Sequence, residues 1–379
     1  MKMKSKLYRV WKYMSERQLR EHYKKHYTRE LAVFENDTDK KARNVIKREM
    51  KMLHKFWGCY PYQYIRYGMY KKSCHLSHEQ MKDYIPNYFA YYLFFPKYFK
   101  DYGIVSEDKE LTYRVLDSYK IKQPVLLLQY KNGVFYDGAK NIISPSAVDG
   151  IVHGSKAKKL FLKPTHGLGG RGIMIFANKD GFVDEDNQSL SAAYIAGQLG
   201  DSEDYILQEG LQQHNELNKI YPNAVNTFRV MTQVKNGKAN IMYSMLRMGQ
   251  GGSQLDNASQ TGLVCKINVE TGKFDDMIHV GHGKTIDKHP DTDFSFKEYV
   301  FPYWDTIKSF VEKTAQKMEA IPFMGWDIAY SKDGPEVIEM NAGAGLEYLQ
   351  DCHGGVRQAY GIEDPKRYWY SKTYAIKDL

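Results

Sequence analysis

The pattern of hydrophobic positions in the first hundred residues is helical. Apolar residues recur at i, i+3, i+4 and i+7 near the start of the chain, at Leu7, Val10, Trp11 and Met14. Ser15 and Gln18 have the spacing of a capping box, which predicts the beginning of a second helix. No alternation of strands and helices is visible in this part of the chain. The sequence therefore predicts a helical N-terminal region over residues 1–104, with acceptor or partner binding as its role.

Beyond residue 105 the pattern changes to that of a mixed domain. It begins with a helix over Asp108 to Tyr119, followed by β-branched and apolar runs separated by turn residues, such as KLFLKP, GIMIFA and TFRVMTQV. An amphipathic helix follows, and its apolar face carries Ile307, Phe310, Val311, Ala315 and Met318. Two final strands are predicted around MGWDIAYS and PEVIEMN. Strands, a helix and then a hairpin predict an α+β domain over residues 105–379.

Composition excludes several classes of protein. With 379 residues and 42% hydrophobic content, the chain is predicted to be globular and not disordered. No stretch approaches the roughly 20 apolar residues of a membrane-spanning helix, and the first residues are too polar for a signal peptide. The four cysteines form no Cys-x-x-Cys pair, so neither a disulfide framework nor a zinc knuckle is indicated. These features predict a cytoplasmic protein and leave its oligomeric state open.

The formal net charge of +9 favours anionic partners, although solubility alone explains it as well. No zinc finger, RNA-recognition signature or basic zipper is present, so nucleic acid is not predicted as a partner. Basic residues surround the apolar stripe of the first helix, at Lys2, Lys4, Lys6, Arg9 and Lys12. That helix could contact a membrane surface, but packing onto the rest of the protein is the favoured interpretation.

A glycine-rich turn follows the run KLFLKP. It contains Gly167, Gly169, Gly170 and Gly172, and it lacks the Walker A pattern. The β-rich run Ile173 to Phe176 after the last glycine excludes a dinucleotide-binding turn, which would open a helix. The glycines are therefore predicted at the tip of a hairpin, where backbone N–H groups can approach phosphate oxygens and Lys163 supplies a positive charge. A turn without a ligand is the alternative. A protein kinase is excluded because H-R-D and D-F-G are absent.

A carboxylate-bearing hairpin near the C-terminus is the strongest chemical signal. Asp333-Gly334 predicts a turn, and Asp327 and Glu339 are equally far from Asp333 in sequence, so a symmetric hairpin would place them opposite each other. Asn341 shares a face with Glu339, because side chains alternate along a strand. Two facing carboxylates repel, so a positive charge is expected between them. Magnesium fits, because it takes oxygen ligands from carboxylates and phosphates; a solvated surface hairpin is the alternative.

The order of these motifs resembles the ATP-grasp superfamily. A lysine before a helix (Asp108-Lys109) precedes the glycine loop, the strand end Gln208-Glu209-Gly210, the segment Asn226-Thr-Phe-Arg229 and the carboxylate hairpin. The chain is most similar to the sugar-transfer-associated branch, through VNTFRVMTQV, LRMGQGGSQLDNASQTG, HPDT and FPYWD, and the resemblance covers residues 105–360. It implies two α+β subdomains that grip ATP, preceded by the helical N-terminal region.

The resemblance also implies roles for individual residues. Lys109 and Lys163 would contact the ATP phosphates, the glycine loop would close over them, and the strand end at Gln208, Glu209 and Leu211 would hold the adenine through its backbone. Asp327, Glu339 and Asn341 would ligate magnesium, with two ions as the expected number. His166 in the loop is a further ATP contact, or else a surface histidine.

Arg229 and Arg247 are the candidate catalytic residues, because guanidinium groups pair bidentately with the oxygens of a carboxylate or an acyl phosphate. Ordinary salt bridges on a strand face are the alternative. Asp256 and Asn257, in a glycine-rich loop, are candidates for orienting the substrate, although turn chemistry accounts for them almost as well.

Three functions remain open at this stage. The first is an ATP-dependent ligase that joins a small-molecule carboxylate, such as a sugar acid, to an amine through an acyl phosphate, in polysaccharide or sugar-conjugate biosynthesis. The second is a phosphotransferase on the same scaffold that acts on a hydroxyl. The third is a non-catalytic nucleotide-binding module, which the intact lysines, glycines and metal ligands disfavour.

Overall fold

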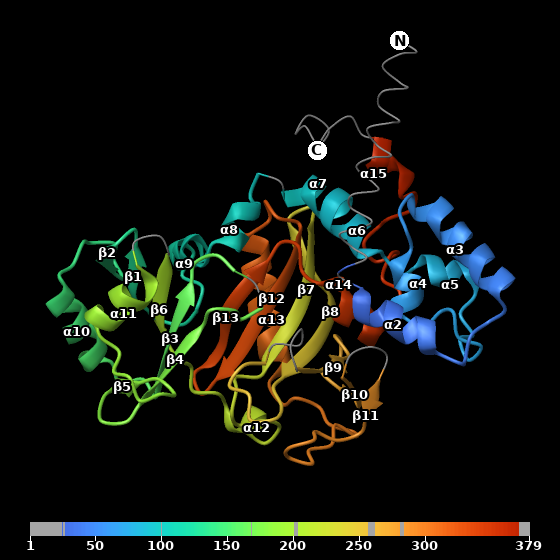
Figure 1. Cartoon of the computed structure of the whole chain (residues 1–379). Coiled ribbons are helices and arrows are strands. Elements are labelled where there is room, and N and C mark those ends of the chain that lie inside the picture. Colours follow the sequence, from blue (N-terminus) through green and yellow to red (C-terminus); the bar gives the residue numbers. More distant parts are fainter. Residues whose placement is uncertain are drawn as a thin grey trace, which may run out of the picture. The chain divides into compact units, whose positions relative to one another are not determined.

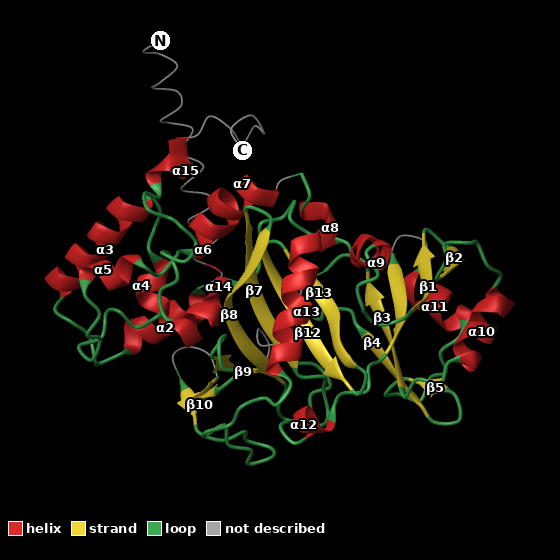
Figure 2. Ribbon diagram, turned by 180° about the vertical axis from the view of Figure 1, so that it is seen from behind, coloured by secondary structure: helices red, strands yellow, loops and turns green. Residues whose placement is uncertain are grey.

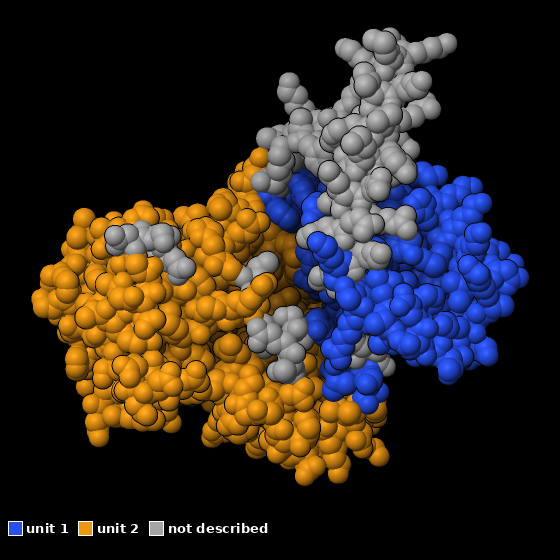
Figure 3. All heavy atoms as spheres, viewed as in Figure 1, with its two compact units in different colours: residues 1–100, 279–285, 345–379 blue, residues 101–278, 286–344 orange. Residues whose placement is uncertain are grey.

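The computed structural model describes residue 25 and residues 27–99, 101–167, 169–200, 204–256, 262–280 and 284–370. The first predicted helix with its basic face, the Ser15–Gln18 capping box and Asn257 lie outside these residues. Contacts divide the chain into two compact units (Figure 3). The first comprises residues 1–100, 279–285 and 345–379, and the second comprises residues 101–278 and 286–344. Residues 345–379 therefore group with the N-terminal region. The predicted division into domains 1–104 and 105–379 stays a prediction.

The first unit is built of helices around an aromatic core. Its elements are α2 (Thr28–Asn36), α3 (Arg43–Trp57), α4 (Tyr62–Arg66), α5 (His78–Lys82), α6 (Asn87–Phe89), η1 (Ala90–Phe94), α7 (Phe95–Phe99), α14 (Leu346–His353) and α15 (Lys366–Tyr370). Trp57, Tyr64 and Phe89 are fully buried. Among the described residues, no helix is both long and apolar enough to cross a bilayer.

The second unit contains a six-stranded sheet with the order β2-β1-β6-β3-β4-β5 (Figure 1). The strands are β1 (Leu126–Lys131), β2 (Val134–Asp137), β3 (Lys159–Pro164), β4 (Met174–Asn178), β5 (Phe182–Val183) and β6 (Tyr205–Glu209). Leu128, Leu160 and Leu162 face a core shared with α10 (Pro145–Gly154) and α11 (Ala192–Leu199). Because side chains alternate along a strand, the opposite face carries Gln129, Lys163 and Gln208.

A seven-stranded sheet of order β11-β10-β9-β8-β7-β12-β13 carries the carboxylate hairpin. Its strands are β7 (Thr227–Lys235), β8 (Lys238–Met248), β9 (Leu263–Ile267), β10 (Phe274–His279), β11 (Thr285–Ile286), β12 (Phe323–Ser331) and β13 (Gly334–Asn341). Helix α13 (Trp304–Lys317) lies along one face of this sheet (Figure 2). There the ring of Trp304 lies 6.2 Å from that of Phe228 on β7.

Three short elements complete the second unit: α8 (Gly103–Glu107), α9 (Lys109–Ser118) and α12 (Asn215–Asn218). The predicted helix over Asp108 to Tyr119 is thus confirmed as α9, with Asp108 as its cap. The amphipathic helix is confirmed as α13, and the α+β class of the domain is confirmed by the two helix-flanked sheets.

Candidate active site

One face of the seven-stranded sheet gathers most of the predicted catalytic and metal-binding residues. Arg229 on β7 pairs in register with Asp327 on β12, and Asp327 pairs on its other side with Glu339 on β13. Arg247 on β8 lies opposite Thr227 of β7. Directly paired residues project from the same side of a sheet. Four neighbouring strands therefore present these polar side chains on the face opposite Phe228 and α13.

The carboxylate hairpin has the predicted pairing of Asp327 with Glu339, but its turn and register differ from those predicted. Symmetric closure about Asp333 was wrong, because Ser331 pairs with Gly334 and the turn contains only two residues. If the register set by this turn continued unchanged, Ile338 would lie opposite Asp327, and Glu339 would project from the other face of the sheet. The register shifts after the Ile328–Val337 pair and leaves Ile338 unpaired. This irregularity, of the kind that β-bulges provide next to active sites, brings Glu339 back to the Asp327 face.

Asp327 is held by both candidate catalytic arginines. Arg229 donates from Nε to Oδ1 at 2.5 Å and from Nη2 to Oδ2 at 2.9 Å, and Arg247 donates from Nη1 to Oδ2 at 2.9 Å. Burial alone would raise the pKa of Asp327, but the two guanidinium charges lower it to about 2. The positive charge that compensates Asp327 thus comes from arginine side chains of β7 and β8, on the side of β12 away from Glu339. A carboxylate offers about four acceptor directions, so one remains available on Asp327.

Glu339 and Asn341 are less committed to protein partners. Glu339 Oε1 lies 3.8 Å from Lys109 Nζ, and 31% of the Glu339 side chain is exposed. Lost hydration and the negative charge of Asp327 raise the pKa of Glu339. Asn341 Nδ2 is buried with no hydrogen-bond partner among the described residues. The repelled carboxylate of Glu339 fits a Mg²⁺ site completed by phosphate oxygens. The N–H₂ group of Asn341 is a hydrogen-bond donor, which suits an acceptor such as a phosphate oxygen and not the metal itself.

Lys109 and the glycine loop meet at the first turn of α9. The Lys109 N–H donates to the Thr165 carbonyl, and its Nζ donates to the Gly167 carbonyl, both at 2.9 Å. His166 Nε2 lies 3.3 Å from Asp108 Oδ2, and 59% of the His166 side chain is exposed. The antiparallel pairing of β3 with β4 confirms that the glycines belong to a hairpin.

All four glycines of this loop have backbone angles that other residues rarely adopt, including Gly167 with a φ of 140°. The φ angles of Gly169, Gly170 and Gly172 are 73°, 71° and 74°. A Cβ atom at Gly172 would also lie 3.3 Å from the hydroxyl of Tyr205. The loop therefore needs glycine for its backbone path and, at Gly172, for its close packing against Tyr205.

Lys163 lies on the six-stranded sheet, on the face away from the core. Its Nζ donates to Gln208 Oε1 at 3.0 Å. Burial lowers the pKa of Lys163 to about 8, with Glu339 acting against the shift and Lys109 adding to it. Lys163 therefore lies within electrostatic range of both residues. Helix α9 and strand β3 thus bring the two predicted phosphate-binding lysines, Lys109 and Lys163, toward Glu339.

The strand end at Gln208–Leu211 is partly occupied by backbone contacts. The N–H groups of Glu209 and Gly210 donate to the carbonyls of Val125 and Lys159. The Glu209 carboxylate accepts from the Ser155 hydroxyl at 2.6 Å. Adenine recognition by the backbone of Gln208, Glu209 and Leu211 stays a prediction, and part of that backbone is engaged in these contacts.

Asp256 joins the arginine cluster through Arg247 and through Thr227, a residue that sequence reasoning did not assign. It accepts hydrogen bonds from the Thr227 hydroxyl and from Arg247, whose Nη2 lies 3.4 Å from Asp256 Oδ1. Burial raises the pKa of Asp256 against the effect of Arg247. The motif Asn226-Thr-Phe-Arg229 was the only sequence signal for Thr227.

The loop before Asp256 is anchored by the segment HPDT, which the sequence showed only as a motif. His289 is fully buried, and its Nε2 lies 2.9 Å from the Gly249 carbonyl. The carboxylate of Asp291 accepts from the Gly251 N–H at 2.6 Å. A further contact comes from β3, where Lys159 Nζ donates to Gln254 Oε1 at 2.7 Å. Segments distant in sequence thus fix the loop that carries Asp256.

Gly325 provides the space that this arrangement requires. A Cβ atom at Gly325 would lie 2.4 Å from the Cβ of Ala344 and 3.6 Å from Arg229 Cδ. We expect Gly325→Ala to lower the free energy of unfolding by about 1–3 kcal/mol. The new Cβ atom would overlap the Cβ of Ala344, and both atoms are attached directly to the backbone, so the clash can be relieved only by moving β12 or the segment that carries Ala344. Urea denaturation measures this change. Gly150→Ala in α10, where a new Cβ meets no atom within 4 Å, is the matched control and should not destabilise the protein. Equal stability of the two variants would contradict the close packing at Gly325.

Comparison with solved structures finds similar folds at low sequence identity. D-alanyl-alanine synthetase A from Vibrio cholerae O1 biovar eltor str. N16961 is 12% identical, with 70% of this chain and 66% of that chain covered and a TM-score of 0.40. D-alanine–D-alanine ligase from Bacillus anthracis is 12% identical, with 69% and 68% covered and a TM-score of 0.36. The ATP-grasp ligase PsnB, complexed with minimal precursor, is 14% identical, with 70% and 63% covered and a TM-score of 0.38. The chain thus spans about two thirds of the length of these proteins.

Sequence comparison gives the family. No curated protein matches the chain. The family model described as sugar-transfer associated ATP-grasp matches residues 93–356, which is more than half of the chain. This range includes the glycine loop, both sheets and the carboxylate hairpin. The chain therefore belongs to the sugar-transfer associated ATP-grasp family.

Proposed function

We propose that this protein is a cytoplasmic ATP-dependent ligase that joins a carboxylate to an amine, in polysaccharide or sugar-conjugate biosynthesis. The main support is the meeting of two sets of residues. The first set is Lys109 on α9 and Lys163 on β3, the predicted phosphate-binding residues. Both lie within electrostatic range of Glu339, which is next to the second set, Asp327 and its arginines. Membership of the ATP-grasp family adds support for ATP as the source of energy.

In this proposal the carboxylate substrate attacks the γ-phosphorus of ATP. ADP leaves, an acyl phosphate forms, and the amine then displaces phosphate to give an amide. Phosphoryl transfer depends mainly on positioning and charge neutralisation. Lys109, Lys163 and the N–H groups of the glycine loop would bind the phosphates, and the backbone of the strand end at Gln208, Glu209 and Leu211 would bind adenine.

The metal-binding residues would be Glu339, Asn341 and the remaining acceptor direction of Asp327. They would hold Mg²⁺, which neutralises phosphate charge when bound. Arg229 and Arg247 would stabilise the acyl phosphate while Asp327 keeps their guanidinium groups in place. Asp256, held by Thr227 and Arg247, would orient the substrate.

An ADP-release screen tests the proposal. Carboxylates, including uronic acids, are combined with amino acids and other amines in the presence of Mg²⁺ and ATP, and products are identified by mass spectrometry. A ligase releases ADP only when both substrates are present and yields an amide. A phosphoester formed without an amine would instead show a phosphotransferase. Nucleotide binding without turnover across the screen would favour a binding module.

A further inference from the structure

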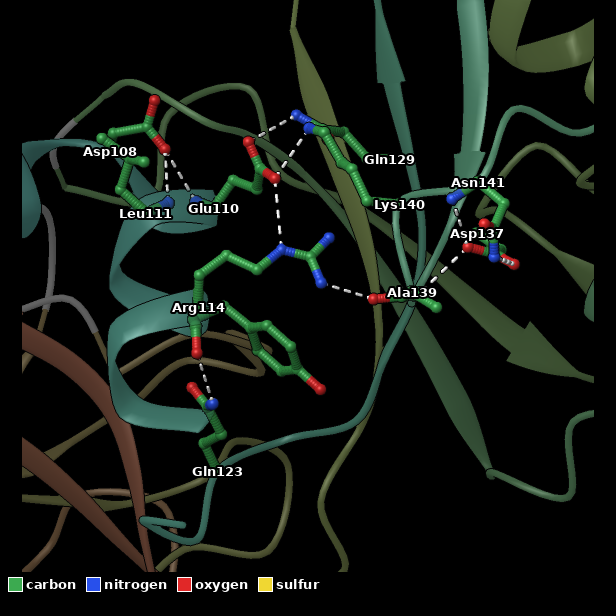
Figure 4. Close-up of polar contacts among 12 residues, drawn as sticks. Asp108, Glu110, Leu111, Arg114, Gln123, Gln129, Asp137, Ala139, Lys140 and Asn141 are labelled. Carbon is green, nitrogen blue, oxygen red and sulfur yellow. Dashed lines mark hydrogen bonds and ion pairs between the residues drawn. The ribbon is translucent and has the colours of Figure 1, made fainter. Parts of the chain in front are cut away.

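A polar network outside the residues assigned above lies between α9 and the six-stranded sheet (Figure 4). Its centre is the carboxylate of Glu110, the residue after Lys109. Glu110 Oε1 accepts from Lys140 Nζ at 2.7 Å and from Arg114 Nε at 3.3 Å. Glu110 Oε2 accepts from Gln129 Nε2 at 3.0 Å. Lys140 also donates to Gln129 Oε1, which closes the network.

The centre of the network is buried and charged, whereas the side chains of Lys140 and Arg114 are 41% and 31% exposed. Gln129 is completely buried, and Glu110 is 8% exposed. Burial by itself would raise the pKa of Glu110, but Lys140, Gln129 and Arg114 together lower it. Glu110 is therefore an anion held by three donors, and charge-assisted hydrogen bonds of this kind fix geometry strongly.

The partners of Glu110 are themselves fixed by the turn after β2. Asp137 accepts from the N–H groups of Ala139 and Asn141, as Figure 4 shows, and Lys140 has a left-handed backbone with φ of 75°. Arg114 Nη1 donates to the Gly138 carbonyl at 2.5 Å. The network thus ties the first turns of α9 to a defined turn and to β1.

Capping of α9 does not explain Glu110. Asp108 already caps this helix, because its carboxylate accepts from the N–H groups of Glu110 and Leu111 at 2.8 and 2.9 Å. The Glu110 carboxylate is directed instead to the sheet. On the other side of the same helix turn, Lys109 contacts the Gly167 carbonyl and faces Glu339.

We propose that Glu110 is a positioning residue, which fixes the N-terminus of α9 so that Lys109 is held at the phosphate end of bound ATP. The inference rests on the proposed function, because it needs ATP between the two sheets. Because α9 is rigidly attached, Lys109 has little conformational freedom before ATP binds. Less conformational entropy is therefore lost on binding, and preorganisation of this kind strengthens binding.

The test compares ligands with and without phosphates. Glu110→Gln should weaken Mg-ATP binding by about tenfold, because neutralising the carboxylate loosens its hold on Lys140 and Arg114. Adenosine binding should stay unchanged, since adenosine has no group for Lys109 to bind. Calorimetry measures ATP affinity, and ligand-observed NMR measures adenosine binding. Asp117→Asn changes an exposed carboxylate of the same helix and is the matched control, with both affinities unchanged.

A double-mutant cycle identifies the residue through which Glu110 acts. In a Lys109→Ala background, Glu110→Gln should cause no further loss of ATP affinity. Additive losses, or an equal loss of ATP and adenosine affinity, would overturn the inference and leave the proposed function intact. A wild-type protein that binds neither ligand would overturn the proposed function itself. If Glu110→Gln does not fold, Gln129→Met removes one donor, and a smaller loss confined to ATP is expected.

Discussion

Asp327→Asn is expected to lower the free energy of unfolding by about 3 kcal/mol, because it removes the carboxylate that pairs with buried Arg229 and one of the two that pair with buried Arg247. Arg229 and Arg247 are only 13% and 14% exposed, so solvent cannot replace the lost carboxylate. Turnover should be lost as well, because both arginines would no longer be oriented. Denaturant unfolding and ADP release on the same preparation measure the two effects.

The pH dependence of this loss follows from the direction of the pKa shift. The pKa of Asp327 is lowered to about 2, below the value of about 3.9 in an unfolded chain. Its contribution to stability is therefore fully present above the unfolded pKa and is lost as the pH falls toward 2. The difference between wild type and Asp327→Asn should be constant from about pH 5 to 8 and shrink in stronger acid.

Asp333→Asn is the matched control for Asp327→Asn. Asp333 lies at the turn of the same hairpin with 61% of its side chain exposed, and an exposed pair with Lys332 contributes little. Its replacement should change neither stability nor turnover. Similar stabilities of the Asp327 and Asp333 variants would mean that the arginine cluster does not stabilise the fold.

The sequence could predict those parts of the fold whose signals are local. The helix from Lys109 and the hairpin around Asp333-Gly334 were predicted because capping residues, periodicity and turn residues lie within a few positions of one another. Asp327 and Glu339 were paired correctly, although the prediction contained no register shift. A shift of one residue depends on how β13 fits its neighbours, and a single sequence does not display that fit.

Contacts between distant segments could not be predicted in the same way. β7 lies between β8 and β12, so Arg229 reaches an aspartate 98 positions away. Sequence reasoning placed these two residues in separate sites, one for the substrate and one for the metal. The hydrogen bond from Lys140 to Glu110 likewise depends on the left-handed backbone of Lys140 in the turn after β2. Asp137-Gly138 signals a turn there, but it does not show that Lys140 adopts this conformation or contacts α9.

Glu339→Gln is expected to reduce turnover at least a hundredfold, roughly the cost of removing one strong charge-stabilising group from an active site. The same change should raise the stability of the ligand-free protein at neutral pH. The pKa of Glu339 is raised by burial and by Asp327. Its ionised form is therefore disfavoured in the folded state, and glutamine relieves this repulsion.

The pH dependence of stability distinguishes the expected effect of Glu339→Gln from general damage to the fold. A raised folded pKa means that the stability contributed by Glu339 is present below its unfolded pKa of about 4.3 and is lost as the pH rises through the folded value. The advantage of Glu339→Gln should thus be largest at pH 7 to 8 and absent near pH 4. Melting temperatures across this range, with and without Mg-ATP, measure it. Mg-ATP should raise the melting temperature of the wild type more than that of the variant.

Glu336→Gln provides the comparison on the same strand. Glu336 is buried, accepts from the Ser331 hydroxyl at 2.7 Å and lies 3.4 Å from Lys122 Nζ, so its carboxylate is compensated by protein partners. Its replacement should destabilise the protein and leave turnover per folded molecule intact. Glu339→Gln should do the opposite if Glu339 binds metal as proposed, because a carboxylate that serves as a metal ligand is stabilised only when the metal and phosphates bind. If Glu339→Gln instead lowered stability and kept turnover, Glu339 would belong to the scaffold, and the metal site would have to lie elsewhere.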